Sequence, residues 1–106
     1  MMDSAHTDVG VNLVVVLIAK DVGSLPELRD LLATQVDLSR QEPGCQRFDA
    51  FESKSAPGTL IVVERWASQA ALDQHRKAKA ITTVYLPKIL PLVERVLHDC
   101  SALPEH

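Results

Sequence analysis

The pattern of apolar and polar positions in the first part of the chain predicts a strand followed by a helix. Residues 11–19 are apolar at almost every position and rich in β-branched side chains, which is typical of a central strand buried on both faces. A helix is predicted to begin at a capping box formed by Ser24 and Glu27 and to end before Pro43 and Gly44. One side of this helix carries, at helical spacing, Leu25, Leu28, Leu32, Gln35, Val36 and Ser39.

Two further strand-like runs indicate a hairpin. Residues 45–53 include Phe48 and Phe51, which stand three positions apart and therefore point to opposite faces of the strand unless a bulge intervenes. A turn signal at residues 55–58 separates this run from a second β-rich run at 59–66. We therefore expect the two runs to pair with each other.

The last third of the chain predicts two helical stretches and a final strand. Ser68 is expected to cap a short helix that carries on one side Ala71, Leu72 and His75. A second helical stretch, from about residue 78, places together Ile81, Val84 and Tyr85. Pro87 and Pro91 are expected to limit this stretch, and residues 93–102 form a plausible last strand, although a helix could extend through 93–95.

The resulting order, β-α-β-β-α-β, is the ferredoxin-like arrangement of the α+β class, an antiparallel sheet with helices on one face. Because the first strand and the two Phe residues also place apolar side chains on the other face, we expect a homodimer that packs sheet against sheet into a barrel, with a monomer as the alternative. Cys45 and Cys100 fall on the two edge strands, too far apart for a disulfide within one chain, and are expected to be reduced thiols.

Composition and charge exclude several classes of protein. The 106 residues fit one domain, predicted to span 11–103 after a flexible leader at 1–10. A net charge of −3 without a basic run argues against nucleic-acid binding. The run at 11–19 is about half the length of a membrane helix, and no basic segment precedes it as in a secretory signal. The expected location is therefore cytoplasmic.

Three stretches of the sequence resemble the antibiotic biosynthesis monooxygenase family. They are residues 39–45 at the first helix-to-strand junction, 48–53 in the hairpin, and 64–75 entering the second helix, which is the strongest signature. The resemblance covers nearly the whole chain and implies a dimeric α+β barrel with a pocket between sheet and helices in each subunit. Members of this family oxidise aromatic polyketides or quinols with O₂ and without metal or flavin, while relatives degrade haem or process autoinducer-2 compounds.

The resemblance implies a cofactor-independent monooxygenase that oxidises a hydroxylated aromatic or quinol with O₂. His75 is the candidate base or hydrogen-bond partner, although a structural histidine fits as well, and Tyr85 is the candidate to position the oxyanion. The two can meet only if the chain bends near residues 77–79, because ten residues of straight helix would separate them by about 280°. The residues expected to bind the substrate are Phe48, Trp66, Leu72 and Ile81, with core packing as the alternative for Trp66.

No metal or cofactor is expected. His6, His98 and His106 form no pair at metal-ligand spacing, and the chain has no glycine-rich phosphate loop. Haem degradation is disfavoured because Tyr85 stands where the resemblance places the iron-ligating histidine of haem-degrading relatives. A buried Glu64 would need a partner, for which Arg47 is the candidate.

Two other functions remain open. The first is an isomerase acting on a small phosphorylated carbonyl, which would need a cluster of basic side chains to point inward. This basic cluster is formed by Arg76, Lys77, Lys79 and Lys88. The alternative for the cluster is a solvated helix face. A non-enzymatic ligand-binding dimer would have a pocket that is closed, or purely apolar, around His75.

Overall fold

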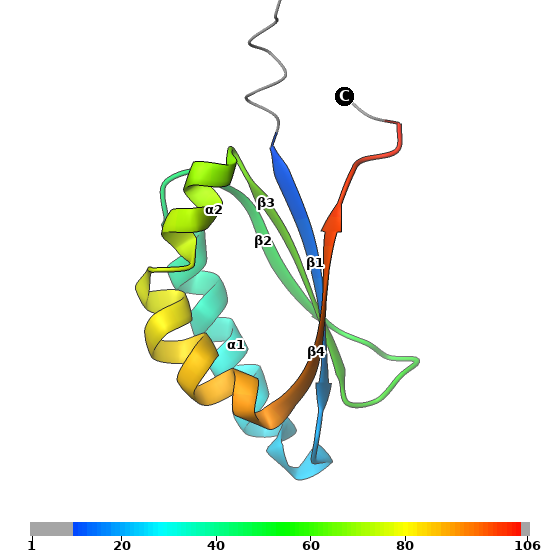
Figure 1. The fold of residues 1–106 in the computed structure, drawn as a ribbon. Helices are drawn as coiled ribbons and strands as arrows, with labels where there is room; N and C mark the ends of the chain where they lie inside the picture. Colours follow the sequence, from blue (N-terminus) through cyan, green and yellow to red (C-terminus); the bar gives the residue numbers. More distant parts are fainter. Residues whose placement is uncertain (1–9, 105–106) are drawn as a thin grey trace, which may run out of the picture.

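The computed structural model describes residues 10–104, and its elements follow the predicted β-α-β-β-α-β order (Figure 1). The predicted leader at 1–10 lies outside the described residues except for its last position. The strands are β1 (Val11–Ala19), β2 (Cys45–Glu52), β3 (Thr59–Trp66) and β4 (Val93–Cys100). The helical elements are η2 (Val22–Ser24), α1 (Leu25–Arg40), α2 (Gln69–His75), the π-helix η3 (Ala80–Ile89) and η4 (Leu90–Leu92).

The four strands form one antiparallel sheet in the order β2-β3-β1-β4, which confirms β1 as a central strand. In the register of the sheet, Val15 lies between Val62 of β3 and Leu97 of β4. Cys45 and Cys100 lie on the two edge strands, as predicted, and both thiols are free. Within residues 10–104, no helix is long and apolar enough to cross a membrane.

The helices all cover one face of the sheet, and the core lies between the two layers (Figure 1). The inner face of β1 contributes Leu13, Val15 and Leu17 to this core. The predicted inner side of α1 is confirmed, since its buried residues are Leu28, Leu32, Gln35, Val36 and Ser39. This side therefore includes two polar side chains among three apolar ones.

The predicted start of α1 is correct, but the predicted capping box of Ser24 and Glu27 is wrong. Ser24 has helical backbone angles, φ −85° and ψ −5°, whereas a capping residue normally has extended ones. Its hydroxyl donates to the carbonyl of Asp21 at 2.6 Å instead of accepting from the first turn of the helix. Asp21 is the capping residue, because its side chain accepts from the backbone N–H of Gly23 and so begins η2 just ahead of α1.

The outer face of the sheet carries a group of apolar side chains that is not covered within one chain. Phe48 and Phe51 point to opposite faces, as predicted, with side chains 1% and 51% exposed. The prediction that β1 is buried on both faces is therefore wrong for a single chain, because the helical layer covers only the inner face. The apolar side chains on the outer face are Val14, Val16, Ile18, Phe51, Ile61, Val63 and Val96.

The chain turns sharply between α2 and η3. The helix α2 is capped by Ser68, whose hydroxyl accepts from the N–H of Ala71 at 3.1 Å, and it ends at His75. The backbone then turns through residues 76–78 before η3 begins, which is the bend predicted near 77–79. Pro87 was expected to limit the second helical stretch but lies inside η3, which continues to Ile89.

Candidate functional site

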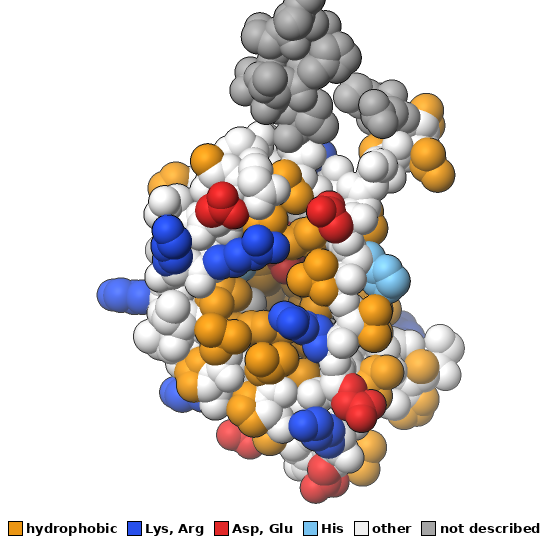
Figure 2. Space-filling model, viewed as in Figure 1, with side chains coloured by type: hydrophobic (Ala, Val, Ile, Leu, Met, Phe, Trp, Pro, Cys, Tyr) orange, Lys and Arg blue, Asp and Glu red, His pale blue; other side chains and the backbone are white. Residues whose placement is uncertain are grey.

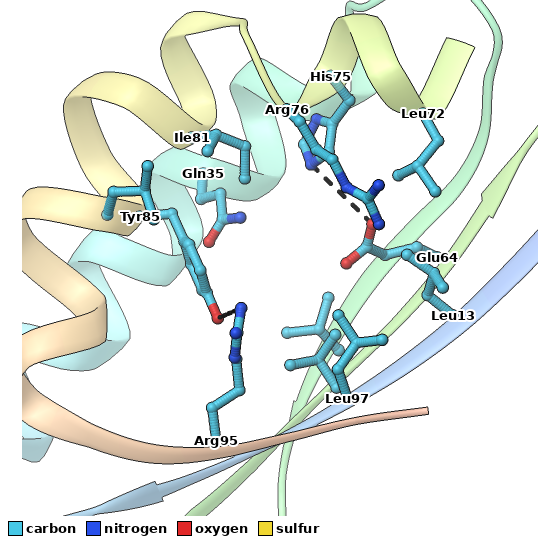
Figure 3. Close-up of a pocket in the computed structure, with 13 residues that line it drawn as sticks. Leu13, Gln35, Glu64, Leu72, His75, Arg76, Ile81, Tyr85, Arg95 and Leu97 are labelled. Carbon is cyan, nitrogen blue, oxygen red and sulfur yellow. Dashed lines mark hydrogen bonds and ion pairs between the residues drawn. The ribbon is translucent and has the colours of Figure 1, made fainter. Parts of the chain in front are cut away.

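A cavity of about 240 Å³ lies between the inner face of the sheet and the helical layer. Figure 2 shows its opening, where apolar side chains line a hollow and basic side chains border it. Apolar lining residues include Leu13, Val15, Val62, Leu72, Ile81 and Leu97. The polar lining residues are Gln35, Glu64, His75, Arg76, Tyr85 and Arg95 (Figure 3). A mainly apolar hollow with a few converging polar groups is the usual form of a small-molecule site.

His75 forms a hydrogen bond with Glu42 through its Nδ1 atom. The imidazole is only 3% exposed, and its Nδ1 lies 2.7 Å from Oε1 of Glu42, in the loop after α1. A carboxylate oxygen can only accept, so the tautomer that fits this contact carries its hydrogen on Nδ1. The Nε2 atom is then an acceptor, and it lies 4.0 Å from Oε1 of Glu64. That distance is too long for a hydrogen bond but allows both atoms to contact one bound oxygen.

Gly44 explains how the loop brings Glu42 to this position. Its φ of +82° is favourable only for glycine, and an added Cβ would lie 2.5 Å from the Cβ of Ala71 on α2. The loop and the helix can therefore pack closely enough for Glu42 to reach His75. Sequence reasoning singled out the stretch 39–45 as a family signature but missed Glu42 as a site residue, since no local periodicity links it to a helix that begins 27 positions later.

Glu64 is a buried carboxyl on the inner face of β3. It is 7% exposed and accepts a hydrogen bond from Nε1 of Trp66 at 2.9 Å. Burial raises the pKa of Glu64, and this effect outweighs the opposing influence of the Trp66 hydrogen bond and of nearby His75 and Arg76. The prediction that Arg47 pairs with Glu64 is wrong, because Arg47 lies beside a register shift in β2 and its Nε donates to Asp49 at 2.8 Å.

A second polar group lies across the cavity, where Tyr85 of η3 approaches Arg95 of β4 (Figure 3). The guanidinium Nη1 of Arg95 donates to the Tyr85 hydroxyl at 3.5 Å, a long hydrogen bond. Burial raises the pKa of Tyr85, and the Arg95 contact opposes that rise, so the hydroxyl stays protonated at neutral pH. The phenol is thus available as a donor to a bound oxygen.

The structure brings together most, but not all, of the predicted site residues. His75, Tyr85, Leu72 and Ile81 line the cavity. Phe48 and Trp66, also predicted to bind the substrate, are not among the lining residues; they are 1% and 0% exposed. Both pack around the imidazole of His75 instead, with ring centroids 5.7 Å and 4.4 Å away, so they support it from the core.

The residues of the basic cluster do not all lie at the cavity. Arg76 lines the cavity, whereas the other three members are exposed side chains outside its lining, namely Lys77, Lys79 and Lys88. The second arginine of the cavity, Arg95, comes from β4 and was missed, as was Gln35. The alternation of side chains along β4 could have indicated Arg95, because Arg95 pairs with Leu17 of β1, whose side chain lies on the inner face.

No group of three potential metal ligands lies together in the part of the chain from residue 10 to 104. His98 lies on β4, while His6 and His106 are outside the described residues.

Comparisons with known proteins identify the family of this chain and support its fold. The model of the antibiotic biosynthesis monooxygenase family matches residues 13–84, more than half of the chain, and the chain therefore belongs to that family. The Mycobacterium tuberculosis protein Rv0793, named as a candidate monooxygenase, is 43% identical over 49 residues. That segment is 46% of this chain and 48% of Rv0793, so it spans about half of the relative's length.

Solved structures extend the likeness to almost the whole fold. The structure of Rv0793 superposes with a TM-score of 0.80 and 25% identity, covering 89% of this chain and 95% of Rv0793. SnoaB of Streptomyces nogalater, a cofactor-independent oxygenase whose structure was solved for a point mutant, superposes with a TM-score of 0.77. It covers 88% of this chain and 92% of its own, but its 12% identity establishes only that the fold is shared.

Proposed function

We propose that this chain is a cofactor-independent monooxygenase that oxidises a small hydroxylated aromatic or quinol with O₂. The observation that carries the proposal is the cavity itself, in which His75, the buried carboxyl of Glu64 and Arg76 face Tyr85 and Arg95 across an apolar floor. Family membership supports the same reaction class, and SnoaB demonstrates that this fold can support oxygenase chemistry without a cofactor. A shared fold alone does not determine the reaction, so the reaction is inferred from the side chains that line the cavity.

The first step is removal of a hydroxyl proton from the substrate. Nε2 of His75 is the acceptor, since Glu42 occupies Nδ1. The hydroxyl binds between Nε2 and Oε1 of Glu64, which lie 4.0 Å apart. Because burial raises the pKa of Glu64, its carboxyl can hold a proton and donate a hydrogen bond to the oxyanion that forms.

The charge of the oxyanion is stabilised by the cations at the edge of the cavity. Arg76 lies on the same side as Glu64, and Arg95 lies beside Tyr85 across the cavity (Figure 3). Positive charges and a phenolic donor that are already in place stabilise a developing anion without reorganising solvent. Both arginines are exposed side chains at the opening, so they act on the oxyanion from the solvent-accessible edge of the cavity.

The oxidation balances without an added electron donor. The deprotonated ring gives one electron to O₂, the resulting pair of radicals forms a C–O bond, and the O–O bond of the peroxide then breaks. One oxygen atom stays on the ring and the other leaves as water with two hydrogens from the substrate. Hydroquinone would thus yield a hydroxyquinone and water. His75 returns its proton during peroxide breakdown.

The size of the cavity favours one or two aromatic rings. A cavity of about 150 Å³ is sufficient to bind benzene, and the cavity here is about 240 Å³. The expected substrates are therefore small substituted rings.

The two other functions have weaker support. Three of the four basic residues that an isomerase on a phosphorylated carbonyl would use are outside the cavity lining. A purely binding role predicts a closed or apolar pocket around His75, whereas this open cavity places Glu64 and Arg76 beside it.

The assembly we propose is a homodimer that packs through the outer face of the sheet. Phe51 and Val96, which lie on that face, are 51% and 50% exposed in the single chain. A group of exposed apolar side chains is unfavourable in water, and a second copy would cover it through a self-complementary interface.

The test is O₂ consumption with hydroquinone, corrected for the uncatalysed reaction. We expect uptake that depends on the enzyme and falls by about 100-fold or more in His75→Ala, the factor typical of a lost general base. The control is Lys88→Ala, since Lys88 is an exposed side chain outside the cavity lining. Equal O₂ uptake by the parent and His75→Ala would show that His75 is not the base.

A further inference from the structure

Gln35 is a buried polar side chain whose position in the cavity remains unexplained by the chemistry above. It lies on the inner side of α1, is 3% exposed, and lines the cavity from the helical side. Figure 3 shows its carboxamide directed toward the cavity, between Tyr85 and His75. Its Oε1 is shielded from solvent and has no hydrogen-bond partner among residues 10–104.

The other polar groups of the cavity are paired. Glu64 accepts from Trp66, His75 contacts Glu42, and Tyr85 accepts from Arg95. A buried acceptor without a partner destabilises the folded chain, and native proteins contain few of them. An unpaired acceptor that borders a ligand cavity therefore points to a partner supplied by the ligand.

We propose that Gln35 determines specificity by accepting a hydrogen bond from a second hydroxyl of the substrate. This inference rests on the proposed function, in which the first hydroxyl binds at His75 and Glu64. Gln35 belongs to α1 and Glu64 to β3, on opposite walls of the cavity, so the two contacts hold opposite parts of one ring. The substrate class is thereby narrowed to dihydroxylated rings.

Rotation about the last side-chain torsion of Gln35 brings the acceptor to the ligand. That torsion is broad in glutamine, so the rotation is easy. A ring that lacks the second hydroxyl would leave the buried Oε1 unpaired. Discrimination by such a missing partner is characteristic of sites built to bind a substrate hydroxyl.

Anaerobic calorimetry with hydroquinone and phenol tests this inference, because binding is then measured without turnover. We expect the parent to bind hydroquinone about tenfold more tightly than phenol, as one buried hydrogen bond predicts. Gln35→Met, which keeps the length of the side chain and removes the amide, should lose this preference. Gln41→Met makes the same change at the exposed C-terminal end of the same helix and should keep it.

Thermal unfolding separates this role from a structural one. Since Oε1 is unpaired, Gln35→Met should leave the melting temperature of the ligand-free protein unchanged or raise it, whereas removing a structural hydrogen bond would lower it. The inference is overturned if Gln35→Met keeps the preference, if the parent has none, or if neither compound binds. Tenfold preference without oxygen uptake in air would refute the monooxygenase reaction but support Gln35 as a binding residue.

Discussion

Replacing Glu42 by Gln tests how the site controls the tautomer of His75. The carboxylate accepts from Nδ1 at 2.7 Å and so keeps Nε2 free for its proposed role as acceptor of the substrate proton. A Gln amide at the same position can either accept through its oxygen or donate through its nitrogen. The second contact would favour the tautomer with hydrogen on Nε2, which cannot act as the base.

The size of the effect follows from the kind of hydrogen bond that is lost. A hydrogen bond to a charged group contributes about 1.5–3 kcal/mol, and a neutral one about 0.5–1.5 kcal/mol. The midpoints of the two ranges differ by about 1.25 kcal/mol, which corresponds to a factor of roughly eight, close to tenfold. We therefore expect kcat of Glu42→Gln to fall about tenfold and the free energy of unfolding to fall by about 1 kcal/mol.

The assay is steady-state O₂ uptake with hydroquinone, together with urea unfolding of each variant. Glu27→Gln is the matched control for kcat, because Glu27 is an exposed carboxylate in the first turn of α1 and lies outside the cavity lining. A folded Glu42→Gln variant with the kcat of the parent would refute the reasoning, since the tautomer of His75 would then not depend on Glu42.

Three further predictions concern the loop, the buried carboxyl and the outer face of the sheet. Gly44→Ala should lower the free energy of unfolding by at least about 1–2 kcal/mol in urea titrations, because φ is +82° and the new Cβ would meet Ala71; an unchanged midpoint would contradict this. Burial raises the pKa of Glu64 above its ordinary value of 4.5, so the folded state keeps a proton that the unfolded chain releases. This contribution to stability is complete below about pH 4.5 and is lost as pH rises through the raised pKa; Glu64→Gln should remove that decline, and an identical pH profile would refute the assignment. Val16→Asp places a charge between Ile61 and Val96 on the outer face and should convert the proposed dimer into a monomer in light scattering, whereas a persisting dimer would exclude this face.

Most of the fold could be predicted from periodicity. The consecutive β-branched residues of β1 and the helical spacing on α1 are strong signals because burial of one face imposes them. The capping of α1 could not be predicted as reliably, since Asp21 and Ser24 are both suitable capping residues and only the backbone angles decide between them. The apolar pattern of β1 predicts burial on both faces, but it does not show whether the outer layer comes from the same chain or from a second copy, and the single chain leaves that face uncovered.

The candidate site was predictable only where its residues share a helix face. His75 and Tyr85 stand on the apolar sides of two helical stretches, and the turn between them brings both to one cavity. Strand parity places Trp66 on the inner face but does not reveal that α2 and His75 cover it. Glu42 reaches the site through a loop conformation, and Gln35 is indistinguishable in sequence from a packing residue until its oxygen is seen without a partner.

Isotopic labelling with heavy-oxygen gas tests whether O₂ supplies the oxygen atom that is added to the product. Hydroquinone is incubated with the parent or with His75→Ala under labelled O₂, and the mass of the organic product is measured by mass spectrometry. We expect a hydroxyquinone carrying one labelled oxygen atom, formed by the parent and strongly reduced with His75→Ala. A product without label, or equal labelling with both proteins, would contradict the assignment of this cavity as a monooxygenase site.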